Sequence, residues 1–303
     1  DRARAMSGLI VAVPCSLALG APLSGLLLEV NWLGLAGWKW LFIIEGLPAV
    51  VLGLVTLGWM TDRPRDARWL TPAEREYLEA RLAAEARAKE AQGRVTIRQA
   101  LRERNVWLLA LGIFAANTGG YALTFWLPTT VRSLSGGTVR TSLWCSGLFY
   151  ACGLASVLWS GRSSDRSGDR KWHAVVGLAA TAVFLAGSTL PGQPFVVVML
   201  WLCLTGLAAY SWPSPFWALP TLTLSASAAA VAVGLINMSA NLAGYCGNHL
   251  FGWLKARGLG DAGCLLFLAA SYLVGAAILA LLRVPPSGKP SGVPANRPVP
   301  STP

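Results

Sequence analysis

Long apolar stretches, separated by short charged ones, form the main pattern of this sequence. A helix that crosses a lipid bilayer needs roughly 20 consecutive, mainly apolar residues. Four stretches of about that length contain no Asp, Glu, Lys or Arg, and a fifth contains a single charged residue, Glu45. Each of them predicts a membrane-spanning helix. The five stretches are 5–28, 40–61, 105–131, 141–161 and 262–282.

The longest uncharged stretch, 174–254, is too long for one helix. Clusters of Pro and Gly mark turns, and such clusters occur at 191–194 and at 213–220. We therefore expect three helices in this stretch, and the chain is predicted to be an all-α, polytopic membrane helix bundle with eight transmembrane helices. The three expected helices run near 174–190, 195–216 and 224–252.

The composition supports this picture and adds an orientation. The chain is 54% hydrophobic and only 13% charged, whereas a soluble domain has about a quarter of its residues charged. If the N-terminus is cytoplasmic, twenty of the 25 Lys and Arg residues fall in cytoplasmic segments, as the positive-inside rule requires. We therefore predict a multi-pass protein of the inner (plasma) membrane, with both ends of this chain cytoplasmic. The net charge of +11 needs no nucleic-acid partner, because basic loops facing an anionic leaflet explain it.

Residues 61–104 differ in kind, since they hold eight of the fourteen acidic and eleven of the 25 basic residues. Thr71-Pro72-Ala73-Glu74 is a capping box with Pro at the first helical position, and it predicts a surface helix from Pro72 to about Glu90. Thr96-Ile97-Arg98-Gln99 repeats the capping signature. We interpret this segment as a cytoplasmic linker. The tail, 283–303, is rich in Pro, Ser and Gly and is predicted to be disordered.

The sequence offers no chemistry of the kinds that enzymes or metal proteins use. The six cysteines all lie in apolar stretches and form no Cys-x-x-Cys pair, so we interpret them as small packing residues. Walker-type, HExxH and GxSxG patterns are lacking. These observations predict that the protein is not an enzyme, that ATP does not drive it, and that it uses no cofactor or metal.

One charged segment, GRSSDRSGDRKWH at 161–173, lies between uncharged stretches. We expect it to form a tight cytoplasmic loop between the fourth and fifth helices. Gly161 would allow close helix contact, and Gly168 a sharp turn. Asp165 is suited to accept hydrogen bonds at the N-terminus of a neighbouring helix. The alternative is a solvated basic loop without a specific role.

The spacing of this segment resembles the loop motif of the major facilitator superfamily of transporters. The matching residues are Gly161, Asp165, Arg166, Gly168, Arg170 and Lys171. Asp169 stands where the family usually has a basic residue, and this departure resembles the anion:cation symporter branch, which includes carriers of tartrate, sugar acids and aromatic acids. Five further stretches are similar to that branch: 38–53, 62–76, 125–128, 215–221 and 236–253.

The resemblance implies which helices of the family this chain contains. The family has twelve helices in two halves, so this chain would hold its fifth to twelfth helices and lack the first four, in agreement with its abrupt start. Residues 1–60 would be the last two helices of the N-terminal bundle, 61–104 the central loop, 105–282 the C-terminal six-helix bundle and 283–303 a cytoplasmic tail.

The resemblance also implies a function: a secondary active transporter of small organic anions, tartrate-like or sugar-acid-like, with protons as the coupling ion. It would work by alternating access, as a monomer. A drug-efflux antiporter of the same superfamily remains an alternative, because 20–25 approaches the Gly-Pro-x-x-Gly-Gly signature of such proteins. A fragment that does not transport alone is another alternative, because the predicted midplane of this chain holds no charged residue. A channel and a structural relic also remain open.

Polar residues at the depth of the bilayer midplane are the candidates for substrate binding, because burying them in lipid is costly. Asn117 and Tyr121 lie four residues apart and share a helix face, as do Asn237 and Asn241. The alternative for all four is hydrogen bonding between helices.

Ser214 and Trp217 belong to the Pro-broken segment, where freed backbone groups can line a cavity. The alternative for Trp217 is an aromatic anchor at the interface. Glu45 is expected to tie helix ends together near the outer interface, although a proton or substrate partner is conceivable. His173 and His249 are expected near the ends of their helices.

Overall fold

The computed structural model describes residues 2–91, 97–224 and 226–284, and within them the regular secondary structure is helical, apart from an isolated bridge between Trp32 and Leu35. The expected all-α class is confirmed for this part of the chain. A short 3-10 helix, η1, covers Pro64–Asp66. The α-helices are α1 (Arg2–Leu27), α2 (Gly37–Trp59), α3 (Pro72–Ala91), α4 (Ile97–Ala100), α5 (Arg104–Ser135), α6 (Val139–Ser167), α7 (Arg170–Gly187), α8 (Phe195–Ala209), α9 (Pro213–Thr223), α10 (Ala226–Ala256) and α11 (Asp261–Ala280).

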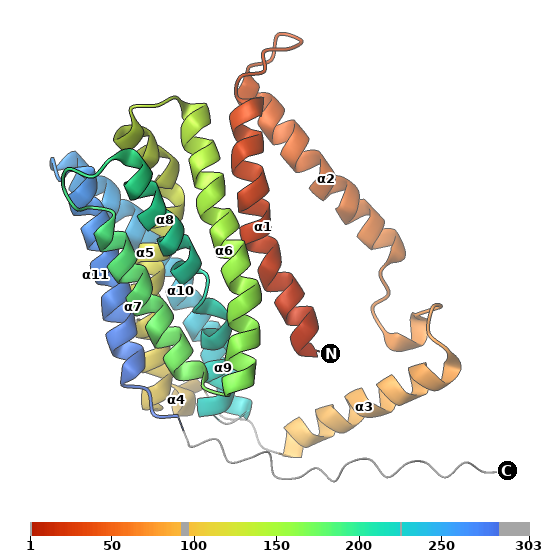
Figure 1. The fold of residues 1–303 in the computed structure, drawn as a ribbon. Coiled ribbons are helices and arrows are strands. Elements are labelled where there is room, and N and C mark those ends of the chain that lie inside the picture. The colour runs from red at the N-terminus through yellow and green to blue at the C-terminus, as the bar shows by residue number, and fades with distance from the viewer. Residues whose placement is uncertain (1, 92–96, 225, 285–303) are drawn as a thin grey trace.

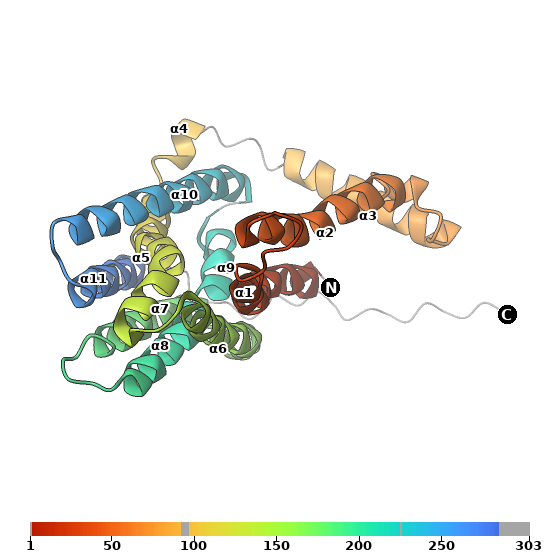
Figure 2. The ribbon, with the colours of Figure 1, turned by 90° about the horizontal axis from the view of Figure 1, so that it is seen from above.

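The helices from α5 to α11 form a bundle, and α1 lies along one side of it, whereas α2 diverges from it (Figure 1). Seen from above, α5 lies in the middle, with α10 and α11 on one side and α7 and α8 on another, and α1 lies against α6 (Figure 2). The linker helix α3 and the turn between α6 and α7 lie at the same end of the bundle (Figure 1). The two most basic segments therefore share one end, as a positive-inside arrangement requires.

Five helical segments among the described residues are long and apolar enough to cross a membrane, and a shorter apolar helix covers 11–27. The predicted count of eight spans is therefore not confirmed and stays a prediction. The five segments are Gly37–Trp59, Arg104–Ser135, Val139–Ser160, Phe195–Thr223 and Asp261–Ala280.

The core of the bundle is built from apolar side chains of all helices from α5 to α11, with small residues where helices meet. A Cβ atom on Gly112 of α5 would lie 2.7 Å from the Leu279 side chain of α11, which shows how closely these two helices pack. Small residues let helix backbones approach one another in lipid, where van der Waals contact replaces the hydrophobic effect between helices. The fully buried core side chains include Leu109, Ile113, Leu178, Leu202, Leu265 and Leu268.

Helix α1 packs along α6. Gly20 of α1 has open space where a side chain would be. The close approach occurs at Gly147 of α6, whose Cβ position lies 2.6 Å from the ring of Pro22. The glycine that permits this contact therefore belongs to α6.

Helix α2 is joined to α1 by the loop of residues 28–36 and then diverges from the bundle (Figure 1). No residue of its apolar window is buried. Ser24 of α1 donates a hydrogen bond to the Glu45 carboxylate of α2, with 2.8 Å between the oxygens. The expectation that Glu45 ties two helices together is therefore met by the structure.

The capping box at the start of α3 forms as predicted. The Thr71 backbone N–H donates to Glu74 Oε2 over 2.9 Å, and the Glu74 N–H donates back to Thr71 Oγ1 over 3.4 Å. The bonds that the Glu74 carboxylate accepts from the Thr71 backbone N–H and from the Thr71 hydroxyl hold the pKa of Glu74 below its ordinary value. The predicted surface helix is confirmed, whereas the second capping signature begins at Thr96, outside the described residues.

The structure corrects the predicted loop at 161–172. Helix α6 continues to Ser167, and only Gly168 and Asp169 connect it to α7. Gly168 has a φ of 69°, which confirms the sharp turn, and the Asp169 side chain caps α7 by accepting a hydrogen bond from Trp172 N. A glycine in the left-handed conformation can end one helix, and an Asp cap can begin the next. Two residues are therefore enough for the connection, and α6 can continue up to Gly168.

The structure also corrects the single helix predicted at 195–216. Helix α8 ends at Ala209, and α9 begins at Pro213, so the break lies at 210–212, just before the proline cluster. Proline fits the first turn of a helix but not its interior. The prolines therefore begin α9, which continues to Thr223.

All six cysteines are free: Cys264 is buried and the others are partly buried. Their interpretation as small packing residues agrees with this placement. The predicted disorder of the tail concerns residues that lie almost entirely outside the described range.

Candidate functional site

A cavity of about 500 Å³ lies between α1, α5, α6 and the junction of α8 and α9, with one residue of α11 in its wall. It brings together three of the six predicted binding residues. Asn117 and Tyr121 reach it from α5, and Trp217 from α9. The prediction that the Pro-broken segment lines a cavity thus holds for Trp217, and for Pro213 at the start of the same helix.

Three tyrosines in the wall of this cavity pack against glycines of neighbouring helices. Three tyrosines lie against a glycine of a neighbouring helix so closely that a Cβ atom there would come within 3.0 Å of the ring. Substituting such a glycine would push the ring out of its place. The three pairs are Tyr121 on Gly244 of α10, Tyr210 on Gly153 of α6 and Tyr272 on Gly119 of α5.

Two polar atoms meet beside Gly120 in the wall. A Cβ atom at this position would lie 3.3 Å from the Tyr272 hydroxyl and 3.9 Å from Asn117 Oδ1. The missing side chain of Gly120 therefore leaves room for both groups at the surface of the cavity. A phenol hydroxyl can donate and accept a hydrogen bond, and an amide can do the same from its two ends.

None of the residues that line this cavity is charged. Its wall offers hydroxyl and amide groups set among aromatic rings, so it can bind oxygen atoms of a ligand by hydrogen bonds and flat apolar surface by contact. Hydrogen bonds to a charged partner contribute about 1.5–3 kcal/mol each. The arrangement is suited to binding and not to proton transfer or covalent chemistry.

The other three predicted residues lie outside the cavity. Asn237 and Asn241 are exposed on α10, where the Asn241 amide donates to the Asn237 carbonyl oxygen over 2.8 Å. Ser214 is partly buried in the first turn of α9. Their part in binding stays a prediction.

Sequence reasoning missed two tyrosines that line the cavity, Tyr210 and Tyr272, and also Thr124. The Thr124 carbonyl oxygen accepts a hydrogen bond from the Tyr150 hydroxyl over 3.2 Å. The signal that could have found these residues is the set of glycines inside α5 and α6, because each leaves room for a large ring on the facing helix.

The residues of the loop motif lie at the end of the bundle where α6 meets α7. Gly168 makes the turn, and Lys171 places its ammonium group 5.0 Å from the centre of the Trp172 ring. Arg170 is the first residue of α7. The side chains of Asp165 and Arg166, and the surroundings of Gly161, lie outside the part that the structure describes.

The two histidines lie near the ends of their helices, as expected. His173 is in the first turn of α7, and the His249 ring lies 4.4 Å from that of Tyr245 in the last third of α10. Among the residues that the structure describes, no group of three or more His, Cys, Asp or Glu side chains is placed to hold a metal ion.

The bundle has the fold of secondary transporters of known structure. The proton:xylose symporter XylE, solved with 6-bromo-6-deoxy-D-glucose, matches with a TM-score of 0.69 at 18% identity, over 93% of this chain and 64% of that one. A bacterial homologue of the human lysosomal transporter Spinster, inward-facing and unoccupied, matches with a TM-score of 0.52 at 15% identity, over 93% and 63%. At these identities the likeness concerns the fold alone.

The chain belongs to the Major Facilitator Superfamily, whose sequence profile matches residues 1–248. The resemblance noted in the loop motif is thereby confirmed, as is the prediction that the chain belongs to a family of transporters and not of enzymes. The apolar helices and the family together identify an integral membrane protein.

Relatives with assigned names are similar over almost the whole chain. A protein of Agrobacterium vitis named "Putative tartrate transporter" is 37% identical over 289 residues, which are 94% of this chain and 66% of that protein. The inner membrane transport protein RhmT of Escherichia coli is 34% identical, with the same coverage. A quinolone resistance transporter of Acinetobacter baumannii is 32% identical over 90% of this chain and 63% of its own length. The chain spans slightly under two thirds of the length of these relatives.

Proposed function

We propose that the protein is a secondary active transporter of small organic anions of the tartrate or sugar-acid kind. The observation that carries the proposal is the 37% identity with the tartrate transporter across 94% of this chain. The uncharged polar groups in the wall of the 500 Å³ cavity support it, because hydroxyl and amide groups can bind the hydroxyls and carboxylates of such a substrate. The mechanism is alternating access, with protons as the coupling ion and a monomer as the working unit.

The proposal includes the arrangement in the membrane. Residues 1–60 act as the last two helices of an N-terminal bundle, 61–104 as the central loop, 105–282 as the C-terminal six-helix bundle and 283–303 as a tail. Both ends of the chain face the cytoplasm of a plasma-membrane protein. The shared position of the basic segments at one end of the bundle supports this orientation (Figure 1).

Within the cavity, Asn117, Tyr121 and Trp217 are proposed to contact the substrate, together with Tyr210 and Tyr272. The amide of Asn117 and the Tyr272 hydroxyl, which both lie within 4 Å of the Cβ position of Gly120, form the polar centre of this set. Asn237, Asn241 and Ser214 are retained as candidates outside the described cavity.

The proposal is tested by measuring binding and uptake separately. Radiolabelled tartrate is equilibrated with the purified chain in a scintillation proximity assay, and uptake is measured in proteoliposomes with an imposed proton gradient. The Agrobacterium vitis relative serves as the parallel sample. Accumulation that follows the proton gradient supports proton symport. If the relative binds tartrate and this chain does not bind tartrate or a sugar acid, the proposal is wrong. If the chain binds but does not accumulate tartrate, the alternative of a chain that does not transport alone is supported.

A second candidate function is efflux of aromatic compounds. Two observations favour it: the 32% identity with the quinolone resistance transporter, and the aromatic wall of the cavity, which includes Tyr121, Phe149, Tyr210, Trp217 and Tyr272. Stacking on such rings suits a flat aromatic ligand better than tartrate. A raised fluoroquinolone resistance in cells that express the chain, with no tartrate binding, would select this function.

A further inference from the structure

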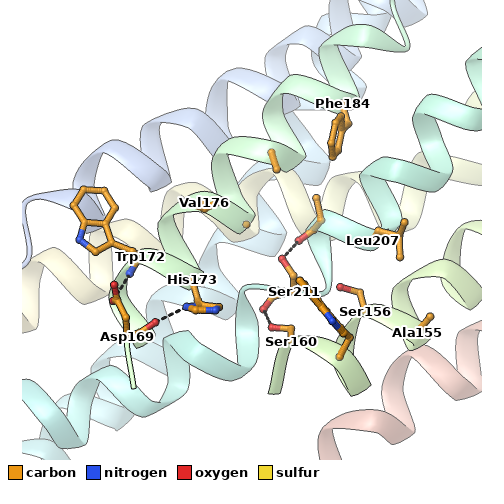
Figure 3. Close-up of a pocket in the computed structure, with 14 residues that line it drawn as sticks. Ala155, Ser156, Ser160, Asp169, Trp172, His173, Val176, Phe184, Leu207 and Ser211 are labelled. Atoms are coloured by element: carbon orange, nitrogen blue, oxygen red, sulfur yellow. Dashed lines mark hydrogen bonds between the residues drawn. The ribbon is translucent and has the colours of Figure 1, made fainter. Parts of the chain in front are cut away.

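A second cavity, of about 730 Å³, lies between α6, α7 and α8 and shares no lining residue with the first. Small-molecule sites commonly have volumes of about 300–1,000 Å³. Figure 3 shows that Asp169 and His173 lie at one end of this cavity, and Ser156 and Leu207 toward the other. From Asp169 to Phe184, which both line it, the chain rises by about 22 Å, at 1.5 Å per residue. The cavity therefore suits an elongated ligand.

The cavity opens toward the lipid. Trp159 and Val176, two large apolar residues of its wall, are 69% and 62% exposed. Trp159 belongs to the segment Val139–Ser160, which is long and apolar enough to cross a membrane. Side chains of this kind on a membrane-embedded helix bundle face acyl chains, because exposure to water would be unfavourable. A ligand of this cavity would therefore enter from the membrane and has to be soluble in lipid.

One hydroxyl group in the wall of this cavity lacks a partner. Ser156 of α6 lines the cavity and is only 5% exposed. Among the residues that the structure describes, none makes a hydrogen bond with its hydroxyl, whereas Ser142 and Ser146 of the same helix donate to carbonyl oxygens of the preceding turn. Lipid offers no hydrogen bond within its hydrocarbon core, and a buried hydroxyl without a partner is unfavourable. A polar group of a ligand would therefore be stabilised beside Ser156.

Two further hydroxyl groups of the wall already donate their protons. The Ser160 hydroxyl donates to the Ser211 carbonyl oxygen, and the Ser211 hydroxyl donates to the Ala208 carbonyl oxygen over 2.7 Å. The oxygen of each hydroxyl can still accept a hydrogen bond. Ser156 and Ser160 are four residues apart, so their Cβ atoms lie about 5–6 Å from one another on one face of α6. A ligand hydroxyl between them can accept from Ser156 and donate to Ser160, whereas an ether or a carbonyl can only accept.

The charges near the cavity favour an uncharged ligand. The described residues that line it include one acidic residue, Asp169, and no Lys or Arg. The Asp169 carboxylate, which caps α7 by accepting from Trp172 N over 3.1 Å, would repel an anion. Lys171 has its ammonium group 5.0 Å from the centre of the Trp172 ring, which belongs to the wall, and would repel a cation. Asp169 also lies at the opposite end of the cavity from Ser156 (Figure 3).

We propose that this cavity is a binding site for one uncharged, lipid-soluble molecule with a hydroxyl group and an elongated apolar body. The hydroxyl lies between Ser156 and Ser160. The apolar body contacts Val176, Ala180 and Phe184, which recur every four residues and so share one face of α7. The inference depends on the membrane location of the chain and not on which solute it carries.

The test is saturation binding of tritiated 4-octylphenol to the purified chain in lipid nanodiscs, with empty nanodiscs as the measure of partition into lipid. Saturable binding of one molecule to each chain is expected. Unlabelled n-octylbenzene, which lacks the hydroxyl, should compete about fivefold less well than unlabelled 4-octylphenol, which is the effect of one hydrogen bond between uncharged groups. The anion 4-octylbenzoate should compete more weakly still. Ser156→Ala should weaken the binding of 4-octylphenol about fivefold and leave the competition by n-octylbenzene unchanged.

Ser146→Ala is the matched control, because Ser146 is buried in the same helix, donates to the Ser142 carbonyl oxygen over 2.8 Å and does not line the cavity. Ala180→Phe, which fills the cavity, should abolish the saturable binding. If that variant does not fold, Ser156→Ala decides the question, since it removes a single oxygen atom. The proposal is overturned if the unaltered chain binds no more 4-octylphenol than empty nanodiscs, or if Ser156→Ala binds it like Ser146→Ala. Equal competition by 4-octylbenzoate and 4-octylphenol would also overturn it, since the site would then accept an anion.

Discussion

Helices α2 and α5 are both long and apolar, yet they have different surroundings. More than half of the apolar window of α5 is buried inside the protein (56%), whereas none of that of α2 is buried. Hydropathy is higher in α2 than in α5, so it does not decide which helix enters the core. In lipid, apolarity places a helix in the membrane, and fit against neighbouring helices decides whether it packs.

The glycines of the two helices show the difference. Gly112 and Gly119 of α5 leave room for Leu279 and Tyr272 of α11. Gly46, Gly53 and Gly58 of α2 have open space around them. Glycine thus permits close contact with a neighbouring helix in α5, whereas in α2 it only makes the backbone more flexible.

The largest effect is expected on stability, when a glycine is replaced by alanine in α10, which is packed in the bundle, and in α2, which is not. Gly247 of α10 packs directly on the backbone of Thr118 in α5. Gly247→Ala should therefore destabilise the bundle by about 3 kcal/mol, as overpacking does. Gly53→Ala in α2 should be neutral or stabilising by about 0.5–1 kcal/mol, because Ala favours the helix. Thermal unfolding in detergent, followed by tryptophan fluorescence, measures both.

If Gly247→Ala unfolds at the same temperature as the unaltered chain, the close packing of α5 and α10 is wrong. If Gly53→Ala is as destabilising as Gly247→Ala, α2 has a partner that its open surroundings do not show.

The next largest effect is expected on tartrate binding by α5. Asn117→Ala should weaken tartrate binding about tenfold, since it removes a hydrogen bond to a charged ligand. Asn105→Ala is the matched control on α5, because Asn105 lies outside the cavity and donates to the Arg283 carbonyl oxygen. Equilibrium binding of radiolabelled tartrate measures both variants. Equal losses in the two would contradict a specific role for Asn117.

A smaller effect is expected where α2 is attached. Ser24→Ala removes the hydrogen bond to Glu45 and should weaken the attachment of α2 to α1 by about 1 kcal/mol or less. Spin labels on the two helices should then show a broader distance distribution. Ser16→Ala serves as the control, because that hydroxyl donates within its own helix, to the Val13 carbonyl oxygen. An unchanged distribution in Ser24→Ala would show that another contact holds α2.

The smallest effect is a pH dependence outside the bundle. Because the bonds from Thr71 lower the pKa of Glu74, the cap stabilises α3 above the ordinary pKa of a glutamate. This stability should be lost as the pH falls through the lowered pKa. Hydrogen exchange in the first turn of α3, compared with that of Glu74→Gln at each pH, should show this loss. If the ratio of the exchange rates of the unaltered chain and Glu74→Gln does not change with pH, this prediction is wrong.

Much of the fold could be predicted from local pattern. The charge-free stretches predicted where helices lie, the Thr71–Glu74 box predicted the start of α3, and Gly168 predicted the turn after α6. These features depend on neighbours in the sequence, whose preferences are local. The predicted loop at 161–172 and the single helix at 195–216 were wrong because charges and prolines indicate where a helix can end, and not where it does.

The candidate site could be predicted only in part. Polarity at midplane depth indicated Asn117 and Tyr121, which do line the cavity. It indicated Asn237 and Asn241 equally, although the cavity does not include them. Tyr272 was missed, because its place depends on Gly119, more than 150 residues earlier in the sequence.

The sequence by itself determined that this chain is a membrane helix bundle of the Major Facilitator Superfamily, because hydropathy, charge asymmetry and short motifs are properties of neighbouring residues. Only the tertiary structure decided which helices pack, which tyrosines meet which glycines, and where cavities lie between the helices. Such contacts join residues that are far apart in the chain, and they depend on the fit of whole helix surfaces, which no local pattern contains.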